Sequence, residues 1–236
     1  MGVDTDSRAR GFAICTTPRS GSNLFSQFLT STGVLGRPLE YFNGPARRVL
    51  TDPAYPDDPE AQIRRILMDG TTPNGVYGVK LFPDQLDAVA ARVPWMKALP
   101  RLAFVLLRRR DLLGQALSWH RALATEQYRS TQISKRAAIY DGAAIMQRLR
   151  TIVGLQARWT MFFARTGIEP LAIAYEDVVD QPQAAVDAVA QLIGLPGAAP
   201  IDTESVDLVV QGDKETEAWR RRFLTEHGSA DFMDKM

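Results

Sequence analysis

The sequence predicts an α/β fold with a central parallel sheet covered by helices on both faces. Short apolar runs of strand length recur along the chain, and segments with apolar residues at helical spacing lie between them. The first of these strands passes into a helix through a tight polar turn. Because strands that alternate with helices join through right-handed crossovers, we expect ligands at the carboxyl ends of the strands.

The predicted strands differ in how apolar they are, and near-continuous hydrophobicity is typical of a strand covered on both faces. The strands are predicted at Gly11–Thr16, Gly75–Phe82, Leu102–Leu107 and, as the weakest of the set, Leu171–Tyr175. Apolar residues at helical spacing predict helices that contain Leu24–Leu29, Leu112–Leu117, Ile145–Phe162 and Val186–Ile193.

Composition limits the classes of function. The 236 residues are 45% hydrophobic and 23% charged with a formal net charge of +1, so the chain lacks the basic field that binds nucleic acid or membrane surfaces. The single cysteine, Cys15, excludes an intramolecular disulfide and is expected to be a small buried side chain. No export signal or membrane-spanning run is found, and we expect a cytoplasmic protein with no integral membrane association.

We expect residues 1–236 to form a single domain, since no repeat or linker divides the chain. Its least regular part is an insertion at about 45–72, where Pro53, Pro56 and Pro59 precede a helical pattern. This insertion is predicted to lie over the edge of the sheet. Such an excursion either shapes a substrate pocket or decorates the surface.

The strongest local motif is the turn Thr16–Asn23, between the first strand and its helix. Backbone N–H groups of such a turn converge on one point, and the helix N-terminus adds about half a positive charge. Hydroxyl, amide and guanidinium donors lie in the same turn, so it is predicted to hold an anion. A capped helix start with an exposed arginine is the alternative. The predicted contacts are Arg19, Ser20, Gly21, Ser22 and Asn23.

This turn differs from a nucleoside-triphosphate loop, because Gly21 is followed by Ser22 and Asn23 where such a loop has a lysine. A second motif, Arg108–Arg110, ends a predicted strand with cations where a magnesium site needs a carboxylate. We therefore expect an anionic partner and no metal.

The arginine run suits a ligand anion at a strand end, with Ser118 on the helix that follows. A solvated charge run at a helix start is the alternative. Two anion sites after two different strands suit a nucleotide that carries two separated phosphate groups.

These motifs, with others further along, resemble the bacterial trehalose 2-sulfotransferase family of nucleotide-dependent carbohydrate sulfotransferases. The matching segments run in order from Phe12 to about Phe223, and together they are more specific than any one of them. The segments are Arg19–Ser22, Pro38–Phe42, Pro73–Leu81, Gln115–Trp119 and Gln211–Trp219.

The resemblance implies a P-loop-like three-layer fold that binds 3′-phosphoadenosine 5′-phosphosulfate (PAPS) and passes its sulfonate to a carbohydrate or glycolipid hydroxyl. It makes Glu40 the catalytic base, where position alone would make it an exposed loop carboxylate. A carboxylate suits the role because a sugar hydroxyl is a poor nucleophile until its proton is removed. Acceptor contacts are implied for Pro38, Glu40, Tyr41 and Phe42, with the insertion on the acceptor side.

The resemblance also assigns roles to cations. Arg19 and Lys80 would stabilise charge on the sulfonate during transfer, although a strand-terminal surface lysine is an alternative for Lys80. Arg109 with Ser118 would hold the 3′-phosphate of the nucleotide. Arg108 is the alternative to Arg109, because the run of arginines leaves the register open by one.

A covering loop near the C-terminus is implied as well, with nucleotide contacts from Gln211 and Thr216. A helix cap explains these two residues equally well. The product nucleotide would be adenosine 3′,5′-bisphosphate (PAP), and the family leads us to expect a homodimer.

One residue departs from the family pattern. Pro18 stands where the trehalose enzymes have a glutamine that contacts the sugar, and proline has no side-chain donor or acceptor. The identity of the acceptor is therefore open. A small-molecule P-loop kinase and a non-catalytic nucleotide-binding module are the alternative functions.

Other conspicuous residues receive a structural interpretation. His120 and His227 lack ligand spacing to each other or to the cysteine, so no zinc site is predicted. Trp159, Phe162 and Phe163 are predicted to pack in the core or at a dimer contact rather than to bind a cofactor.

Overall fold

The computed structural model describes residues 9–126, 138–207, 214–231 and 233–234. In these ranges four strands form one parallel sheet in the order β2-β1-β3-β4. The strands are β1 (Arg10–Cys15), β2 (Val76–Leu81), β3 (Leu102–Arg108) and β4 (Leu171–Ala174). Each predicted strand is confirmed to within one residue at either end. Tyr175, predicted to end the last strand, instead begins a helix.

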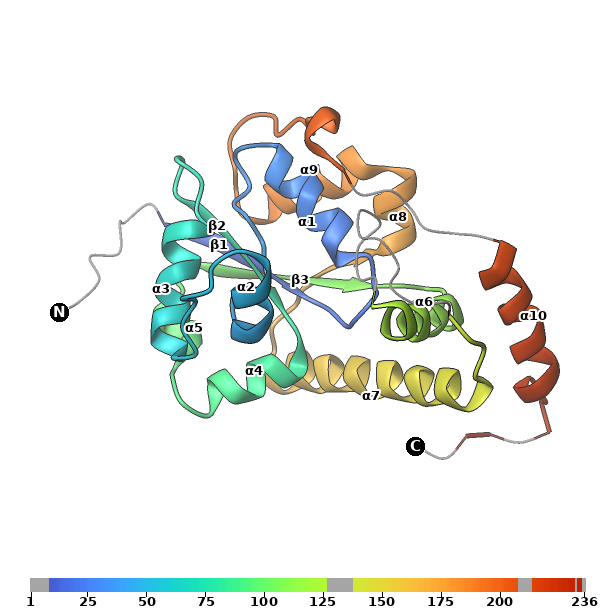
Figure 1. The fold of residues 1–236 in the computed structure, drawn as a ribbon. Coiled ribbons are helices and arrows are strands. Elements are labelled where there is room, and N and C mark those ends of the chain that lie inside the picture. Colours follow the sequence, from blue (N-terminus) through green and yellow to red (C-terminus); the bar gives the residue numbers. More distant parts are fainter. Residues whose placement is uncertain (1–8, 127–137, 208–213, 232, 235–236) are drawn as a thin grey trace.

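Helices cover both faces of the sheet, which confirms the predicted three-layer α/β fold (Figure 1). Helices α1, α8 and α9 lie over one face, and α4 and α7 lie over the other. The helices are α1 (Ser22–Ser31), α2 (Gly44–Leu50), α3 (Pro59–Asp69), α4 (Pro83–Ala90), α5 (Trp95–Ala98), α6 (Leu112–Thr125), α7 (Gly142–Thr166), α8 (Tyr175–Asp180), α9 (Pro182–Leu192) and α10 (Lys214–His227). None of the described helices has the length and apolarity needed to span a bilayer.

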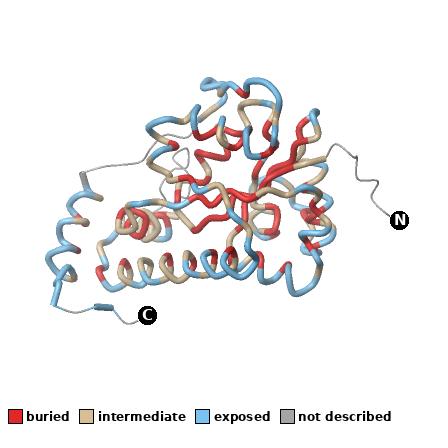
Figure 2. The backbone as a smooth tube through the Cα atoms, turned by 180° about the vertical axis from the view of Figure 1, so that it is seen from behind, coloured by how far each residue is buried: buried red, intermediate tan, exposed pale blue. Residues whose placement is uncertain are grey.

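Two apolar clusters, one on each face of the sheet, hold the layers together. Side chains of β1 alternate between them: Phe12 and Ile14 join the cluster with α1 and α9, whereas Ala13 and Cys15 join the cluster with α7. A strand covered on both faces needs an apolar residue at every position, which explains the continuous runs. Figure 2 shows the result as buried backbone concentrated in the sheet.

The predicted core roles are confirmed for three residues. Cys15 is fully buried, and burial raises the pKa of its thiol. Trp159 and Phe163 of α7 are also buried, and Phe162 packs against the same cluster. A further apolar cluster joins α6, α7 and α10.

The segment before α2 is attached to the free edge of the sheet. Leu39 forms an isolated parallel bridge with Val79 of β2, and the N–H of Lys80 donates to the Leu39 carbonyl at 2.9 Å. Gly78 permits this approach, because a Cβ there would lie 3.0 Å from the ring of Pro38. The pairing places the residue that follows Leu39 beside the end of β2.

Candidate active site

The turn between β1 and α1 has a constrained backbone. Arg19 has a φ of 62°, which is uncommon for a residue with a side chain and costs about 1–2 kcal/mol. Gly21, the N-cap of α1, has a φ of 85°, and a Cβ there would overlap the ring of Tyr175. Position 21 therefore needs glycine both for its φ and for the close approach of Tyr175.

Side chains from later elements fix this turn from within the protein. Gln115 of α6 is fully buried, and its Nε2 donates to the Thr17 hydroxyl at 2.9 Å and to the Pro18 carbonyl at 2.6 Å. Trp159 donates from Nε1 to the Thr16 carbonyl at 2.9 Å. The turn is thus held in place before any ligand arrives, which is the condition for preorganised electrostatic catalysis.

The start of α1 suits an anion from outside the helix. Asn43, Asp58, Asp111 and Asp141 cap α2, α3, α6 and α7 with their side chains. In the described part of the chain no side chain caps α1, α4, α5, α8 or α9, so the missing cap leaves the N–H groups of α1 open to an anion without distinguishing it from these helices.

The polar side chains of the turn are not equally available to a ligand. The hydroxyl of Ser20 is buried and lies 2.6 Å from the Thr16 hydroxyl, and Ser22 is also buried. Asn23 is less buried, and its side-chain oxygen accepts a hydrogen bond from Lys80. The backbone and Arg19 are therefore the stronger candidates for anion binding at this turn.

The two candidate arginines at the end of β3 point in different directions. Arg108 is exposed, and its Nη2 donates to the Thr160 hydroxyl of α7 at 3.0 Å. Arg109 places its guanidinium carbon 5.1 Å from the centre of the Tyr175 ring. Arg108 is the last residue of β3, and Arg109 is the first residue after the strand. Arg109 is the one that shares a neighbour with the β1–α1 turn.

Tyr175 and Ser118 bring the two predicted anion sites together. Burial raises the pKa of Tyr175, while the nearby charges of Arg109 and Arg19 oppose that rise. Arg19 also donates from Nε to the Ser118 hydroxyl at 3.2 Å. The structure therefore joins the arginine of the first motif to the serine of the second.

The N-terminus of α6 is occupied by a carboxylate of the protein itself. Both oxygens of Glu176 accept from the Arg110 N–H at 3.1 Å, and Oε1 also accepts from the Asp111 N–H at 3.2 Å. A helix start that already holds an anion offers little to a second one. An anion at this strand end must therefore be held by side chains such as Arg109.

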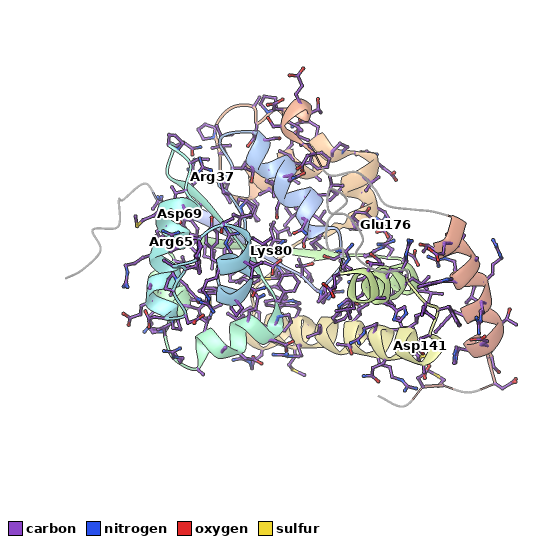
Figure 3. The ribbon with its side chains drawn as sticks, viewed as in Figure 1. Arg37, Arg65, Asp69, Lys80, Asp141 and Glu176 are labelled. Atoms are coloured by element: carbon purple, nitrogen blue, oxygen red, sulfur yellow. The ribbon has the colours of Figure 1, made fainter. Side chains whose placement is uncertain are left out.

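Glu40 and Lys80 form an ion pair, with 3.2 Å between Oε1 and Nζ. The Lys80 side chain is 3% exposed and the Glu40 side chain is 29% exposed, so the carboxylate is the part that reaches solvent. Lys80 lies toward the centre of the molecule in Figure 3, and its Nζ also donates to the Asn23 side-chain oxygen at 2.5 Å. Lys80 thus connects the predicted base to the start of α1.

Opposing effects set the protonation of Glu40. Burial alone would raise its pKa, but the Lys80 charge opposes this, and hydrogen bonds lower the pKa further. Asn43 Nδ2 donates to Glu40 Oε2 at 3.0 Å, and Gln85 Nε2 lies 3.4 Å from the same oxygen. The pKa of Glu40 is lowered overall, so the carboxylate is ionised at neutral pH and is free of a proton.

The other residues expected to contact an acceptor lie inside the protein. Tyr41 is 1% exposed and Phe42 is 8% exposed, and both belong to an apolar core cluster. Pro38 is buried against Gly78. In this structure the three residues support the segment that carries Glu40, and their contact with an acceptor stays a prediction.

The C-terminal candidates are described only in part. Thr216 of α10 accepts a hydrogen bond from Arg121 Nη1 of α6 at 2.5 Å, and Gln211 lies outside the described residues. Arg220, also on α10, pairs at 2.5 Å with Asp111, which lies 3.7 Å from Arg109. Within the described ranges no three His, Cys, Asp or Glu side chains gather as a metal site would require.

Sequence reasoning did not identify four residues of this site. Asn43 and Gln85 carry no motif, and they reach Glu40 only because α2 and α4 start beside it. Tyr175 is the residue predicted to end the last strand, and Glu176 comes directly after it. The acidic pair Glu176-Asp177 directly after that predicted strand was the available signal, since carboxylates favour the first turn of a helix.

Known proteins are similar to this chain over nearly all of its length. A family model described as Stf0 sulphotransferase matches residues 11–226. A trehalose 2-sulfotransferase from Mycobacterium tuberculosis is 31% identical, over 92% of this chain and 95% of that protein. One from Mycolicibacterium smegmatis is 25% identical, over 90% and 93%. The crystal structure of a sulfotransferase from Alicyclobacillus acidocaldarius shares the fold, with a TM-score of 0.52 at 13% identity over 94% and 93% of the two chains.

Proposed function

Since the chain belongs to the Stf0 sulphotransferase family and is a sulfotransferase, we propose that it transfers the sulfonate of PAPS to a hydroxyl of a carbohydrate or glycolipid. The observation that carries this proposal is the Glu40–Lys80 pair, held beside the turn that suits an anion. Family membership favours this reaction over a P-loop kinase and over a non-catalytic nucleotide-binding module.

The proposed reaction is an in-line displacement at sulfur. Glu40 accepts the proton of the acceptor hydroxyl while the acceptor oxygen forms a bond to sulfur. The bond from sulfur to the 5′-phosphate oxygen breaks, and its electron pair leaves with the product nucleotide, PAP. Arg19 and Lys80 stabilise the charge that develops on the sulfonate and the bridging oxygen. No metal is needed, because fixed cations supply the electrostatic stabilisation.

In this proposal the nucleotide spans the two anion sites. Arg19 and the backbone of residues 20–23 hold the 5′-phosphosulfate, and Arg109 with Ser118 holds the 3′-phosphate. The Tyr175 ring between Gly21 and Arg109 supports both assignments, because it fixes the distance between the two loops. A loop that includes Gln211 and Thr216 would cover the nucleotide.

The acceptor is proposed to be a trehalose-type sugar or a glycolipid that contains one. The two relatives reported above are trehalose 2-sulfotransferases, and Glu40 is partly exposed toward such an acceptor. Pro18 replaces a side chain that could hydrogen-bond the sugar, so selection among sugars is assigned to the insertion at about 45–72. A homodimer remains part of the proposal.

The deciding experiment measures transfer of labelled sulfonate from PAPS to trehalose, to other disaccharides and to glycolipids. Glu40→Gln is expected to lower the transfer rate by about 10²–10⁴-fold, the usual contribution of a general base, while PAP still binds. Glu169→Gln, an exposed carboxylate between α7 and β4, is the matched control and should keep full activity. Full activity in Glu40→Gln would exclude this residue as the base.

A further inference from the structure

The two oxygens of the Glu40 carboxylate have different partners. Oε2 accepts from the amides of Asn43 at 3.0 Å and Gln85 at 3.4 Å. Oε1 lies 3.2 Å from Lys80 Nζ, which in turn binds Asn23 at the start of α1. The carboxylate therefore has a defined orientation, with Oε2 turned toward α2 and α4 and Oε1 turned toward the anion-binding turn.

Asn43 is held in place through both its side chain and its backbone. Its Oδ1 accepts from the Ala46 N–H at 3.3 Å and so caps α2, while its backbone N–H donates to the Glu40 carbonyl at 3.1 Å. Rotating the amide by half a turn would remove the cap and place an oxygen against the carboxylate. The amide nitrogen is therefore committed to Glu40 by the same contacts that start the helix.

The two ends of the Gln85 amide differ in their hydrogen bonding. Its Oε1 is buried and has no hydrogen-bond partner among the described residues, although a buried carbonyl without a partner is destabilising. The opposite amide orientation would bring Oε1 close to Glu40 Oε2. The observed orientation thus accepts an unpaired oxygen and keeps a donor directed at the carboxylate.

We propose, on the basis of the role proposed for Glu40, that Asn43 and Gln85 are positioning residues that occupy Oε2 and so direct Oε1, the oxygen that pairs with Lys80, toward the acceptor to take its proton. The acceptor O–H bond breaks with its proton passing to Oε1, and the oxygen forms its bond to sulfur. The sulfur bond to the 5′-phosphate oxygen breaks at the same centre. Neither amide touches the reacting atoms.

The first test is Asn43→Ser, because serine can still cap α2 but cannot reach Glu40. With trehalose as the acceptor probe, kcat should fall about tenfold or more while KM for PAPS is unchanged, since a misplaced base loses part of its contribution. A ¹³C titration of the Glu40 carboxyl should show a higher pKa, because a hydrogen bond to the charged form is lost. The matched control is Asp141→Ala, which removes the cap of α7 and should lower the melting temperature without changing kcat.

The second test is Gln85→Met, which removes both the donor and the unpaired oxygen. Its melting temperature should be unchanged or higher while kcat falls, a combination that a purely structural role does not produce. An unchanged kcat and an unchanged Glu40 titration in both variants would overturn the proposal and leave Glu40 as the base. A retained rate in Glu40→Gln would overturn the base and the positioning roles together. If Asn43→Ser does not fold, Gln85→Met decides the question.

Discussion

Lys80 is a buried cation that pairs with polar groups of the site. An ammonium removed from water is stable only when it is paired, and here Glu40 and Asn23 supply pairing. The dependence is mutual, since the Lys80 charge is the main effect that lowers the pKa of Glu40 against burial. The charge of Glu40 is therefore controlled by a residue on a different element.

A pH prediction follows from this coupling. Above its usual pKa of 4.5 Glu40 is charged and contributes stability, and that stability is lost only as the pH falls through the lower folded value. In Lys80→Met the opposing charge is absent, so burial should raise the pKa of Glu40 relative to the unsubstituted protein. Titration of ¹³C-labelled glutamate carboxyls measures this, with the Glu40 signal assigned from Glu40→Gln.

The matched control for this titration is Lys97→Met, which removes an exposed lysine of α5 and should leave the Glu40 signal unchanged. A Glu40 pKa that is unchanged in Lys80→Met would show that the hydrogen bonds to Oε2, rather than Lys80, control its charge.

Among single residues, the sequence identified those that lie within motifs. Glu40, Lys80 and Arg109 could be named because each follows a recognisable pattern. Their partners could not, because Gln85 and Tyr175 reach the site through packing of elements that are distant in the sequence. The direction of each arginine at the end of β3 also required the strand register, which one sequence does not determine within one residue.

At the scale of elements, the junction from β4 to α8 connects the two candidate anion sites. Tyr175 contacts the β1–α1 turn at Gly21 and stacks with Arg109, while the next residue, Glu176, binds the N-terminus of α6. Two successive residues thus set the spacing of two loops that follow different strands. The predicted strand ended one residue late here because Tyr175 is an aromatic residue of the kind that favours strands.

Gly21→Ala tests this junction. The new Cβ would collide with the Tyr175 ring in a backbone with a φ of 85°, so we expect a loss of roughly 2–5 kcal/mol in stability and much weaker PAP binding. Thermal unfolding and calorimetric titration with PAP measure the two effects.

Gly33→Ala supplies the comparison for this variant. Gly33 follows α1 with a φ of 68°, and a Cβ added there would have no neighbour within 4 Å. The alanine should therefore lose only the backbone contribution of about 1–2 kcal/mol and bind PAP normally. Equal losses in the two alanine variants would show that contact between Gly21 and Tyr175 is unimportant.

Across the whole molecule the net charge is near zero, but positive charge is concentrated at one edge of the sheet. The net charge is +1, yet Arg19, Lys80 and Arg109 lie at the carboxyl ends of β1, β2 and β3. The parallel sheet brings these ends to one edge, so cations that are far apart in the sequence lie at the same edge, as the proposed nucleotide site requires. This arrangement was predictable from the order of strands and helices, whereas the Glu176 carboxylate within it was not.

PAP should therefore stabilise the domain against thermal unfolding more than ATP with magnesium does. At about 100 times its dissociation constant PAP contributes about 2.7 kcal/mol, which raises the melting temperature by roughly 5–10 °C for a chain of this size. ATP with magnesium should give a smaller shift, since the turn lacks the P-loop lysine. A differential scanning experiment compares them, and a larger shift with ATP would contradict the assignment to PAPS.

The isolated bridge between Leu39 and Val79 fixes the position of Glu40 independently of most of the segment to which acceptor selection is assigned. The backbone at Glu40 takes its place from the sheet, one residue after this pairing, and its carboxylate is oriented by Asn43, which caps α2. A replacement of the segment after α2 that keeps Asn43 and the start of α2 should therefore leave the carboxylate in place. Under the proposed function, acceptor preference is then open to re-engineering in that segment without moving Glu40.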